Sequence, residues 1–209
     1  MRNEEKDTIL YMYRLTSDTG LAPCVDNGIW TLAVCKGGQI RNGKPCNTGL
    51  RHKIGSEDQY RSKNIYVLGT YHNKFLYLAR VTEVISMEEY FQTRSKGRTD
   101  NIYSFKNGSL DRNDFLRKDK IHTEADCIIK DLAGQYVLIS DDFIYLGRDA
   151  AVIDIVKQYN PNFQETKTYA GKTAEAIIQA CEAYRDGEKH LPHDPFETKT
   201  KEKPCGGCK

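Results

Sequence analysis

The sequence predicts an α+β fold: a curved, mostly antiparallel sheet or a partly closed β-barrel, with few peripheral helices. Three observations support this prediction. Strand-like runs of β-branched and aromatic residues dominate the middle of the chain, helical periodicity is confined to short segments, and no internal repeat is present. With 209 residues and 39% hydrophobic content, the chain can bury one sizeable core. We expect one domain over residues 1–187 and a polar tail over residues 188–209.

The first predicted strands lie on either side of a turn-rich loop. "TILYMYRL" (residues 8–15) and "IWTLAVCK" (residues 29–36) mix β-branched and aromatic residues between turn signals. The segment "NIYVLGTYHNKFLYLARVTEVIS" (residues 64–86) contains two further runs around the turn "YHNK". It therefore predicts a hairpin whose second strand is long and apolar.

A short helix is predicted at residues 86–94, "SMEEYFQTR". Ser86 stands where a helix cap is needed and Glu89 follows three residues later, which is the capping-box arrangement. Residues 95–120 are polar and rich in Gly, Asp and Asn, so they predict an irregular segment on the surface.

The last elements are a pair of strands and a helix. "QYVLISDDFIYLG" (residues 135–147) predicts two strand-like runs joined by a turn or bulge at "SDD". A helix is predicted at residues 171–186, where apolar side chains recur at helical spacing: Ala174, Ile177, Ile178, Cys181 and Tyr184. Its opening "GKT" does not predict a phosphate-binding loop, because residue 166 is Thr where that motif needs Gly and no strand is expected directly before it.

The charge balance limits the partners that the chain can attract. It carries 31 basic and 29 acidic residues, a net charge of +2, so no field of the whole molecule draws it to nucleic acid or to a membrane. Recognition of an anion must be local, and binding to unmodified duplex DNA is expected to be weak. The first residues lack the apolar core of a signal peptide, and no apolar run is long enough to span a bilayer. We therefore expect a cytoplasmic protein with no membrane partner.

Seven cysteines, an odd number, favour reduced thiols over a disulfide framework. Cys35, Cys127 and Cys181 lie in apolar stretches and are expected to be small core residues.

Several blocks of the sequence, taken in order, resemble one known family. These blocks are "YRLTSDTGLAP", "WTLAVCKGGQIR", "IYVLGTYHNKFLYLARVTEVISMEEYF", "DNIYSF" and "VLISDDFIYLGRDA". Over about residues 9–150 they resemble the second type of nucleotide modification associated domain, found in bacteria and phages. The resemblance implies an association with modified nucleic-acid bases, without naming a reaction.

The strand, the hairpin and the long apolar strand are also similar in pattern to the barrel of PUA, EVE and YTH domains. Those domains hold a modified base in an aromatic-lined pocket. The similarity implies a partly closed, PUA-like barrel as one form of the predicted sheet.

The first candidate binding residues lie in the loop after residue 15. Asp18, Thr19 and Gly20 can form an Asx-type turn that directs backbone N–H groups at an anion or a base edge. The alternative is a polar loop that only connects two strands. Trp30 offers a flat face on which a base can stack, and its alternative is a place in the core.

Further candidates are basic residues and the block "DNIYSF". Lys36 and Arg41 can bind a phosphate, the alternative being solvated surface charge. Asp100 and Asn101 can read the Watson–Crick edge of a base, the alternative being a turn cap. Tyr103 of the same block completes the predicted ligand-binding set.

No catalytic residue is assigned from the sequence. His52, His72 and His122 have no Ser or Cys nucleophile at a sequence spacing that would indicate a catalytic triad. A transferase-like site could form at the hairpin tip, residues 71–73, together with a glutamate. The absence of dinucleotide- and triphosphate-binding motifs disfavours those cofactors.

Three classes of function remain open. The first is a module that binds, or acts on, a modified base or nucleotide within a DNA or nucleotide modification system. The second is a transferase-type enzyme acting on a base or nucleotide. The third is a sponge for a free nucleotide signal in phage–host conflict.

The tail contains a candidate structural zinc site. His190 and His193 are followed by Cys205 and Cys208, and two imidazoles with two thiolates can complete a tetrahedral zinc shell. The alternatives are a disordered charged tail and a redox pair. Zinc at this tail is the one cofactor that the sequence raises.

Overall fold

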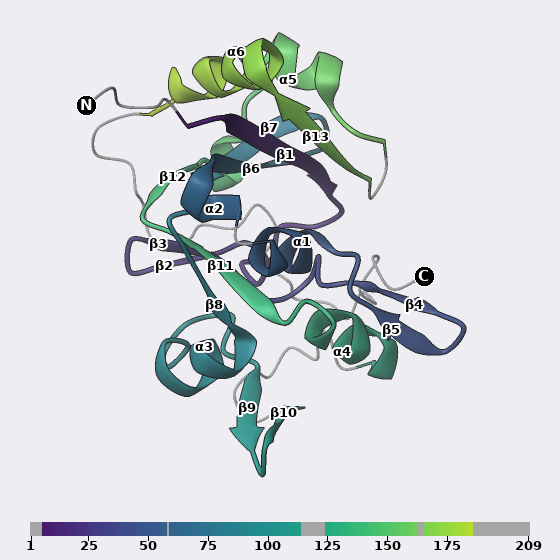
Figure 1. Ribbon diagram of the computed structural model, residues 1–209. Helices are drawn as coiled ribbons and strands as arrows, with labels where there is room; N and C mark the ends of the chain where they lie inside the picture. The colour runs from purple at the N-terminus through teal and green to yellow at the C-terminus, as the bar shows by residue number, and fades with distance from the viewer. Residues whose placement is uncertain (1–5, 58, 114–123, 163–164, 186–209) are drawn as a thin grey trace, which may run out of the picture.

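The computed structural model describes residues 6–57, 59–113, 124–162 and 165–185. Its larger sheet, here called the main sheet, has five strands in the order β12-β7-β6-β1-β13. In chain order these strands are β1 (Thr8–Leu15), β6 (Asn64–Tyr71), β7 (Lys74–Arg80), β12 (Asp142–Tyr145) and β13 (Thr166–Ala170). The β1–β6 pair is parallel and the other pairs of the main sheet are antiparallel (Figure 1).

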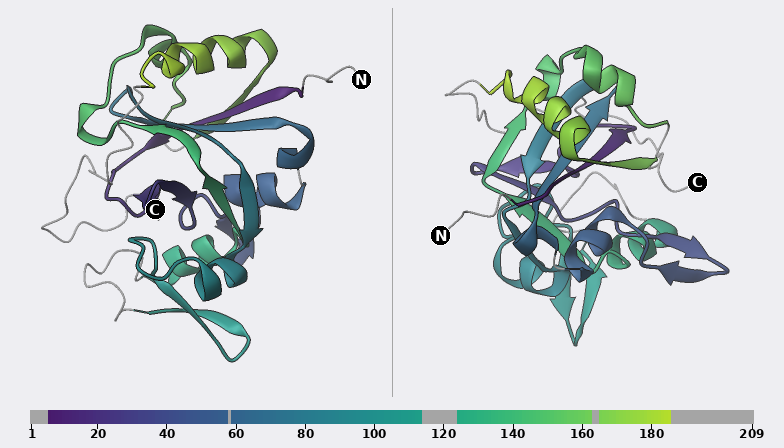
Figure 2. Two further views of the ribbon diagram at one scale, coloured as in Figure 1. Left: turned by 90° about the vertical axis from the view of Figure 1, so that its left-hand side faces the viewer. Right: turned by 45° about the horizontal axis from the view of Figure 1, so that its top comes forward.

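β1 is buried on both faces, which explains its nearly continuous apolar sequence. Leu10 and Met12 face one side, where they pack against α5 (Asp154–Tyr159) and α6 (Gly171–Glu182). Tyr11 and Tyr13 face the other side and join a core shared with the second sheet. Figure 2 shows α5 and α6 covering the outer face of the main sheet.

The second sheet has four strands in the order β2-β3-β11-β8. Their bounds are Cys24–Asp26 for β2, Ile29–Leu32 for β3, Glu83–Ser86 for β8 and Tyr136–Ser140 for β11. Its inner face contributes Trp30 and Leu138 to the shared core, where Trp30 lies 5.5 Å from the Tyr77 ring between centroids. Its outer face packs against α3 (Met87–Thr93).

The chain passes from one sheet to the other at two points. Val81 donates its N–H to Ile65 of the main sheet, and the next residue, Thr82, donates to Ile139 of the second sheet. The predicted long second strand is therefore wrong, because it divides into β7 and β8. The second passage is the predicted turn at "SDD", where the Ser140 hydroxyl bonds to the backbone of Asp142. That turn is confirmed.

Two antiparallel ribbons project from this body (Figures 1 and 2). One consists of β4 (Gln39–Arg41) and β5 (Lys44–Cys46), the other of β9 (Tyr103–Lys106) and β10 (Ser109–Arg112). The prediction of an irregular segment at residues 95–120 is thus wrong for residues 103–112. Both ribbons, and the β2–β3 hairpin, turn at an Asn–Gly pair whose two residues have positive φ, as the tight turns of hairpins require: Asn27–Gly28, Asn42–Gly43 and Asn107–Gly108.

The remaining helices are short. They are α1 (Leu50–Ser56), α2 (Gln59–Ser62), α4 (Ala125–Leu132) and the 3₁₀ turn Gly147–Asp149. Two predicted helices are confirmed. The Ser86 hydroxyl accepts the Glu89 N–H at the start of α3, and α6 buries the predicted apolar face except for Tyr184, which lies beyond its end and is exposed.

The predicted α+β class and the mostly antiparallel pairing are confirmed. None of the sheets formed by the described residues closes into a barrel, so the PUA-like barrel is not confirmed. The expectation that no strand precedes "GKT" is wrong, because β13 ends at the residue before Gly171. The expected strand at residues 29–36 ends at Leu32, since Cys35 and Lys36 adopt positive φ.

The cysteines follow the sequence prediction in part. Cys24, Cys35, Cys46 and Cys181 are not disulfide-bonded, and Cys181 is buried as expected. Cys35 is only half-buried, and Cys127, although buried, is disulfide-bonded, so the expectation of reduced thiols fails at Cys127. No helix among the described residues has the length and apolarity needed to cross a bilayer.

Candidate functional site

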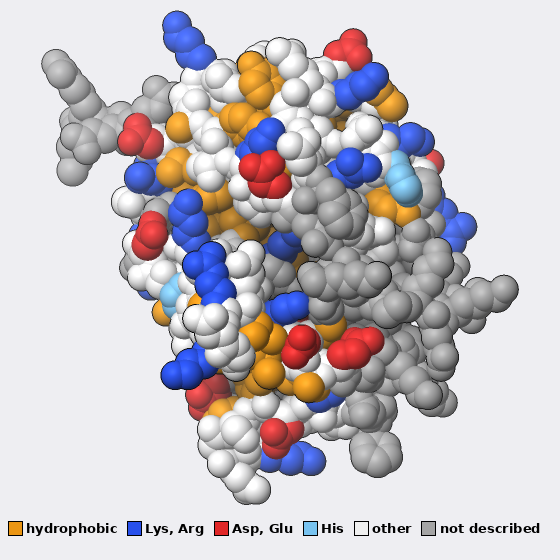
Figure 3. Space-filling model, turned by 90° about the vertical axis from the view of Figure 1, so that its right-hand side faces the viewer, with side chains coloured by type: hydrophobic (Ala, Val, Ile, Leu, Met, Phe, Trp, Pro, Cys, Tyr) orange, Lys and Arg blue, Asp and Glu red, His pale blue; other side chains and the backbone are white. Residues whose placement is uncertain are grey.

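A cleft of about 900 Å³ opens beside β1 and β13. Its other walls are the loop before β4 and parts of α1 and α4. Figure 3 shows a hollow on this face of the molecule, with Lys and Arg side chains around it. Lining residues that matter below are Tyr11, Tyr13, Thr19, Lys36, Lys53 and Asp131.

The wall of the cleft on the main sheet presents alternate residues of two paired strands. Tyr11 and Tyr13 lie two residues apart on β1 and therefore on the same face. In the sheet register they stand opposite Thr168 and Thr166 of β13, which also line the cleft. This wall thus combines two tyrosine rings with two hydroxyl groups.

Each of these rings has a lysine ammonium over it. Lys36 Nζ lies 4.4 Å from the centre of the Tyr13 ring, and Lys53 Nζ lies 5.3 Å from that of Tyr11. Both distances are within the range of cation–π attraction. Lys53 is exposed on α1, whereas Lys36 is half-buried, and burial lowers the pKa of its ammonium. Lys36 is thus a partly desolvated cation at the wall of the cleft.

The backbone that presents Lys36 is strained. Cys35 and Lys36 have φ values of 58° and 47°, in the left-handed region where non-glycine residues cost about 1–2 kcal/mol each. Close packing holds the segment in place. A Cβ atom added to Gly37 would lie 2.3 Å from the Lys130 carbonyl oxygen, and one on Gly49 would lie 2.2 Å from that of Lys36.

Arg51, at the start of α1, fastens this segment from beneath. Its side chain is fully buried and donates from Nε to the Cys35 carbonyl at 2.7 Å. Nη1 donates to the Tyr136 carbonyl and Nη2 to the Asp131 carbonyl, each at 2.5 Å. Burial lowers the pKa of Arg51, and the neighbouring Asp131 carboxylate opposes this effect. One guanidinium therefore joins the Lys36 loop, the end of α4 and the start of β11.

Asp131 completes the support. Its carboxylate accepts the Cys35 N–H at 2.7 Å and the Tyr103 hydroxyl at 3.1 Å. Burial raises the pKa of Tyr103, and the Asp131 carboxylate raises it further, so the phenol stays protonated and donates. We call Arg51, Asp131 and Tyr103 the clamp, because together they hold both backbone groups of Cys35.

Two residues of the predicted ligand-binding set line the cleft, namely Thr19 and Lys36. Gly20 is next to Thr19 and has a φ of 79°, as a tight turn requires. Asp18 is buried and accepts the Tyr145 hydroxyl at 2.7 Å. Arg41 is exposed near the tip of the β4–β5 ribbon.

Trp30 and Tyr103 lie away from the surface of the cleft. Trp30 is fully buried between the sheets, and the Tyr103 hydroxyl is used by the clamp. Neither aromatic face is exposed to a ligand in this structure. Ligand binding by the predicted set as a whole stays a prediction.

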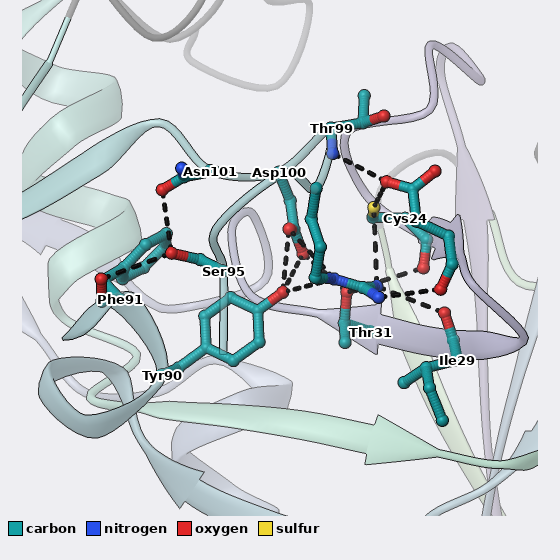
Figure 4. A network of polar contacts seen from close by, with 11 residues as sticks. Cys24, Ile29, Thr31, Tyr90, Phe91, Ser95, Thr99, Asp100 and Asn101 are labelled. Atoms are coloured by element: carbon teal, nitrogen blue, oxygen red, sulfur yellow. Dashed lines mark hydrogen bonds and ion pairs between the residues drawn. The ribbon is translucent and has the colours of Figure 1, made fainter. Parts of the chain in front are cut away.

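Asp100 belongs to a buried polar network beside the β2–β3 hairpin (Figure 4). Its carboxylate accepts the Thr31 hydroxyl at 2.5 Å and the Tyr90 hydroxyl at 2.8 and 2.9 Å. The Arg98 guanidinium lies 3.6 Å away, and both side chains are almost completely buried. Burial raises the pKa of Asp100, while Arg98 and the two hydroxyl groups oppose the rise.

Arg98 connects this carboxylate to the hairpin backbone. Nη1 donates to the Asp26 carbonyl at 2.8 Å, and Nη2 donates to the Ile29 carbonyl at 3.2 Å and the Thr31 hydroxyl at 3.0 Å. Asn101 accepts the Ser95 hydroxyl at 2.8 Å. Asp100 and Asn101 thus both bond to nearby protein groups in a network that fixes the segment after α3.

Groups for catalysis or metal binding are sparse in the described part of the chain. No histidine lines the cleft there, and no cluster of three or more His, Cys, Asp or Glu residues could hold a metal ion. At the tip of the β6–β7 hairpin, Asn73 accepts a hydrogen bond from Asn160 and Tyr71 packs edge-on against His72. His122, His190, His193, Cys205 and Cys208 lie outside the described residues.

The sequence matches the family described as nucleotide modification associated domain 2 over residues 7–202. This match spans nearly the whole chain. The chain belongs to this family. Comparison with curated proteins gave no match. Comparison with solved structures also gave none.

The name of the nucleotide modification associated domain 2 family links its members to nucleotide modification systems. In this member of the family, the site residues predicted from the sequence do not include Tyr11, Tyr13, Lys53 and the clamp residues Arg51 and Asp131. One local signal was available, since "CKGG" places a lysine before two glycines. The pairing of Arg51 with Asp131 had no local signal, because 80 residues separate them.

Proposed function

We propose that the cleft binds a nucleotide, either a free nucleotide or the nucleotide of a modified base, and that Lys36 pairs with its phosphate. The observation that carries the proposal is the strained and supported position of Lys36. Two consecutive residues in the left-handed region, held by a buried arginine and a buried aspartate, place one ammonium at the cleft.

The energetics of Lys36 favour an anionic ligand. Partial burial of its ammonium costs free energy, and the contact with the Tyr13 ring compensates only part of that cost. A phosphate would supply a full opposite charge at the same point and would raise the lowered pKa. Strain and a perturbed pKa that coincide at a cleft are typical of binding and catalytic sites.

The rest of the cleft suits a sugar and a base. Its volume of about 900 Å³ lies within the usual range of small-molecule sites. Hydrogen-bond donors and acceptors are offered by the hydroxyl groups of Thr16, Ser17 and Thr19 in the loop after β1, and by that of Thr48. Leu21 and Leu50 offer apolar contact area for a ring.

Binding without turnover is the form of this proposal that we favour. The described lining includes no histidine that could act as a base toward a nucleophile. The hairpin tip, proposed as a transferase-like site, is absent from the lining, so the enzyme alternative has less support. A sponge for free nucleotides differs from a reader of modified DNA only in preferring free to polymeric ligands.

Lys36→Met is expected to lower nucleotide affinity at least about tenfold, because it removes a charge-assisted contact. Its melting temperature should change by less than about 4 °C, since the desolvation cost and the ring contact oppose each other. The assay offers the full chain modified and unmodified nucleotides, single strands and duplexes, with mass spectrometry of bound and released material. Lys106→Met, an exposed lysine on the β9–β10 ribbon, is the matched control.

We expect bound nucleotide of unchanged mass and weak duplex binding with a shallow salt dependence. A changed mass in the released material would establish turnover and favour the transferase alternative. Wild-type affinity in Lys36→Met would contradict the proposed role of Lys36.

The zinc site predicted for His190, His193, Cys205 and Cys208 lies outside the described residues. We retain it as a proposal for the protein with its thiols reduced, because zinc binds cysteine as the thiolate. All four protein ligands would be used, so the zinc would be structural. Metal analysis of the protein, purified without a tag, should find close to one equivalent, with loss of zinc in Cys205→Ser. Less than about a tenth of an equivalent, unchanged by that substitution, would remove the proposal.

A further inference from the structure

We infer that the β4–β5 ribbon binds the phosphate backbone of a single-stranded nucleic acid, one nucleotide of which lies in the cleft. This inference rests on the proposed function, since it names a polymeric strand, and not a free nucleotide, as the ligand of the same site. Two features of the ribbon support it, namely its origin at the rim of the cleft and the charges beside its turn.

The ribbon begins at the rim of the cleft and leads away from it. Gln39 and Ile40, at the start of β4, line the cleft, whereas Arg41 and Lys44, on either side of the turn, do not. Figure 1 shows the ribbon projecting from the body next to α4. A nucleotide confined to the cleft therefore does not contact these two cations. A strand that continues from the cleft along the ribbon does.

Close packing at the base of the ribbon fixes its position. A Cβ atom added to Gly38 would lie 2.2 Å from the Cys46 carbonyl oxygen and 2.8 Å from the Ala133 Cβ. Gly38 stands directly before β4, and Cys46 is the last residue of β5. The ribbon thus starts from a rigid contact with the end of α4.

The two charges beside the turn have the same sign. Arg41 and Lys44 stand directly opposite each other in the register of the ribbon, and both are exposed. Like charges in such a cross-strand pair destabilise a sheet. Phosphate groups would neutralise both cations, and the guanidinium of Arg41 can bind a phosphate through two parallel hydrogen bonds.

The ribbon belongs to the longest stretch of the sequence without an acidic residue. Residues 27–56 contain no Asp or Glu, although 29 of the 209 residues of the chain are acidic. The basic residues of this stretch lie in the clamp, at the cleft or on the ribbon: Arg51, Lys36, Lys53, Arg41 and Lys44. One segment thus carries exposed positive charge from the cleft onto the ribbon, with no carboxylate of its own to neutralise it.

The β9–β10 ribbon provides a comparison within the same chain. It also turns at an Asn–Gly pair, but Lys106 stands opposite Ser109, and Asp111 contributes a negative charge. None of its residues lines the cleft. Exposed charges protect the edges of a ribbon from pairing with other chains, and the β9–β10 ribbon has them without a like-charge pair. Protection of the edges therefore does not explain the pairing of Arg41 with Lys44.

A single strand fits this arrangement better than a duplex. A base has to leave its stack to enter the cleft, and extruding it from a duplex also breaks its base pair. The two cations of the ribbon neutralise only about two phosphates, which offsets little of that cost. A single strand carries the same phosphates and has no base pairs to break.

The test measures binding to the full chain by fluorescence anisotropy at several salt concentrations. The labelled probe is a DNA single strand of about 12 unmodified nucleotides, a length within the range that single-strand-binding domains cover. The same sequence as a duplex and the four nucleoside 5′-monophosphates are compared with it. We expect the single strand to bind at least about tenfold more tightly than the duplex or the monophosphates.

A ribbon variant, Arg41→Gln/Lys44→Gln, removes both cations. Its affinity for the single strand should fall about tenfold, and the slope of log affinity against log salt should decrease by about 1.4, or about 0.7 for each phosphate contact. Monophosphate affinity should stay within about twofold. Lys96→Gln/Lys106→Gln is the matched control, because it removes two exposed cations elsewhere and changes the net charge equally.

Lys44→Glu separates ligand binding from a structural role of the charges. It replaces the like-charge pair with an opposite-charge pair, so the melting temperature should be equal to that of the wild type or higher. Affinity for the single strand should nevertheless fall. A purely structural role predicts unchanged affinity in this variant.

The outcomes are distinguishable. If the single strand binds no more tightly than the monophosphates or the duplex, or if the ribbon variant keeps wild-type affinity, the inference is overturned while nucleotide binding stands. An equal loss in Lys96→Gln/Lys106→Gln would assign the effect to net charge and would also overturn it. If neither the monophosphates nor the single strand binds, and no nucleotide is captured from the wider panel, the proposed function itself fails.

Discussion

Replacing Arg51 with methionine is expected to destabilise the protein by about 3–5 kcal/mol, because it leaves three backbone carbonyl groups without their donor and the buried Asp131 carboxylate without its neighbouring positive charge. Arg51 is fully buried and reaches Cys35, Asp131 and Tyr136 from one guanidinium. Methionine fills part of the volume but supplies no N–H group. The strained backbone at Lys36 would then lose one of its supports.

Urea denaturation measures this loss. Arg51→Lys should fall between the wild type and Arg51→Met, because an ammonium keeps the charge but cannot match the three directions of a guanidinium. Arg94→Met is the control, since Arg94 is half-exposed and contacts Glu83 at 3.3 Å on the surface, a contact that contributes about 1 kcal/mol or less. Equal effects of Arg51→Met and Arg94→Met would contradict the clamp.

Arg98→Met is expected to lower the free energy of unfolding by about 3–5 kcal/mol, because it leaves Asp100 as an uncompensated buried charge. The decisive measurement is a double-mutant cycle with Asp100→Asn, which removes the carboxylate charge but keeps an acceptor. In the wild-type background Asp100→Asn should destabilise, because Arg98 loses its partner. In the Arg98→Met background the same substitution should be neutral or stabilising.

The expected coupling free energy is about 1–3 kcal/mol, as for contacting residues in one network. Additive effects would show that Arg98 acts only through its bonds to the hairpin backbone. Those bonds, to Asp26 and Ile29, are unaffected by Asp100→Asn.

Patterns of neighbouring residues predicted the strands and helices that are determined mainly by their own sequence. β1 matches its predicted bounds, because a run of β-branched and aromatic residues lies between turn signals. The Ser86 cap and α6 were predicted for the same reason. The Asn–Gly pairs of the β4–β5 and β9–β10 ribbons carried an equally strong signal that the sequence analysis did not use. Those two ribbons were therefore predictable.

Other features depend on contacts between distant residues and could not be predicted locally. The apolar run at residues 74–86 divides because Val81 and Thr82 bond to different sheets, and its composition does not show that. The residues around Trp30 in the sequence are compatible with a buried side chain and with an exposed one, so they do not decide between the two. The cleft likewise depends on Arg51 reaching residues 80 and 85 positions away. Lys36 was predicted as a ligand-binding residue because a lysine can pair with a phosphate. The contacts of Arg51 and Asp131 that support its loop could not be predicted.

The position of β1 has a consequence for the order of folding. β1 pairs with β6 on one side and with β13 on the other (Figure 1). The backbone groups on one edge of β1 therefore lack their strand partner until residues 166–170 have been synthesised. Such non-local pairing slows folding and leaves an exposed strand edge that can pair with another chain. The wall carrying Tyr11 and Tyr13 is completed by those same residues, so the site forms only when synthesis of the described domain is nearly finished.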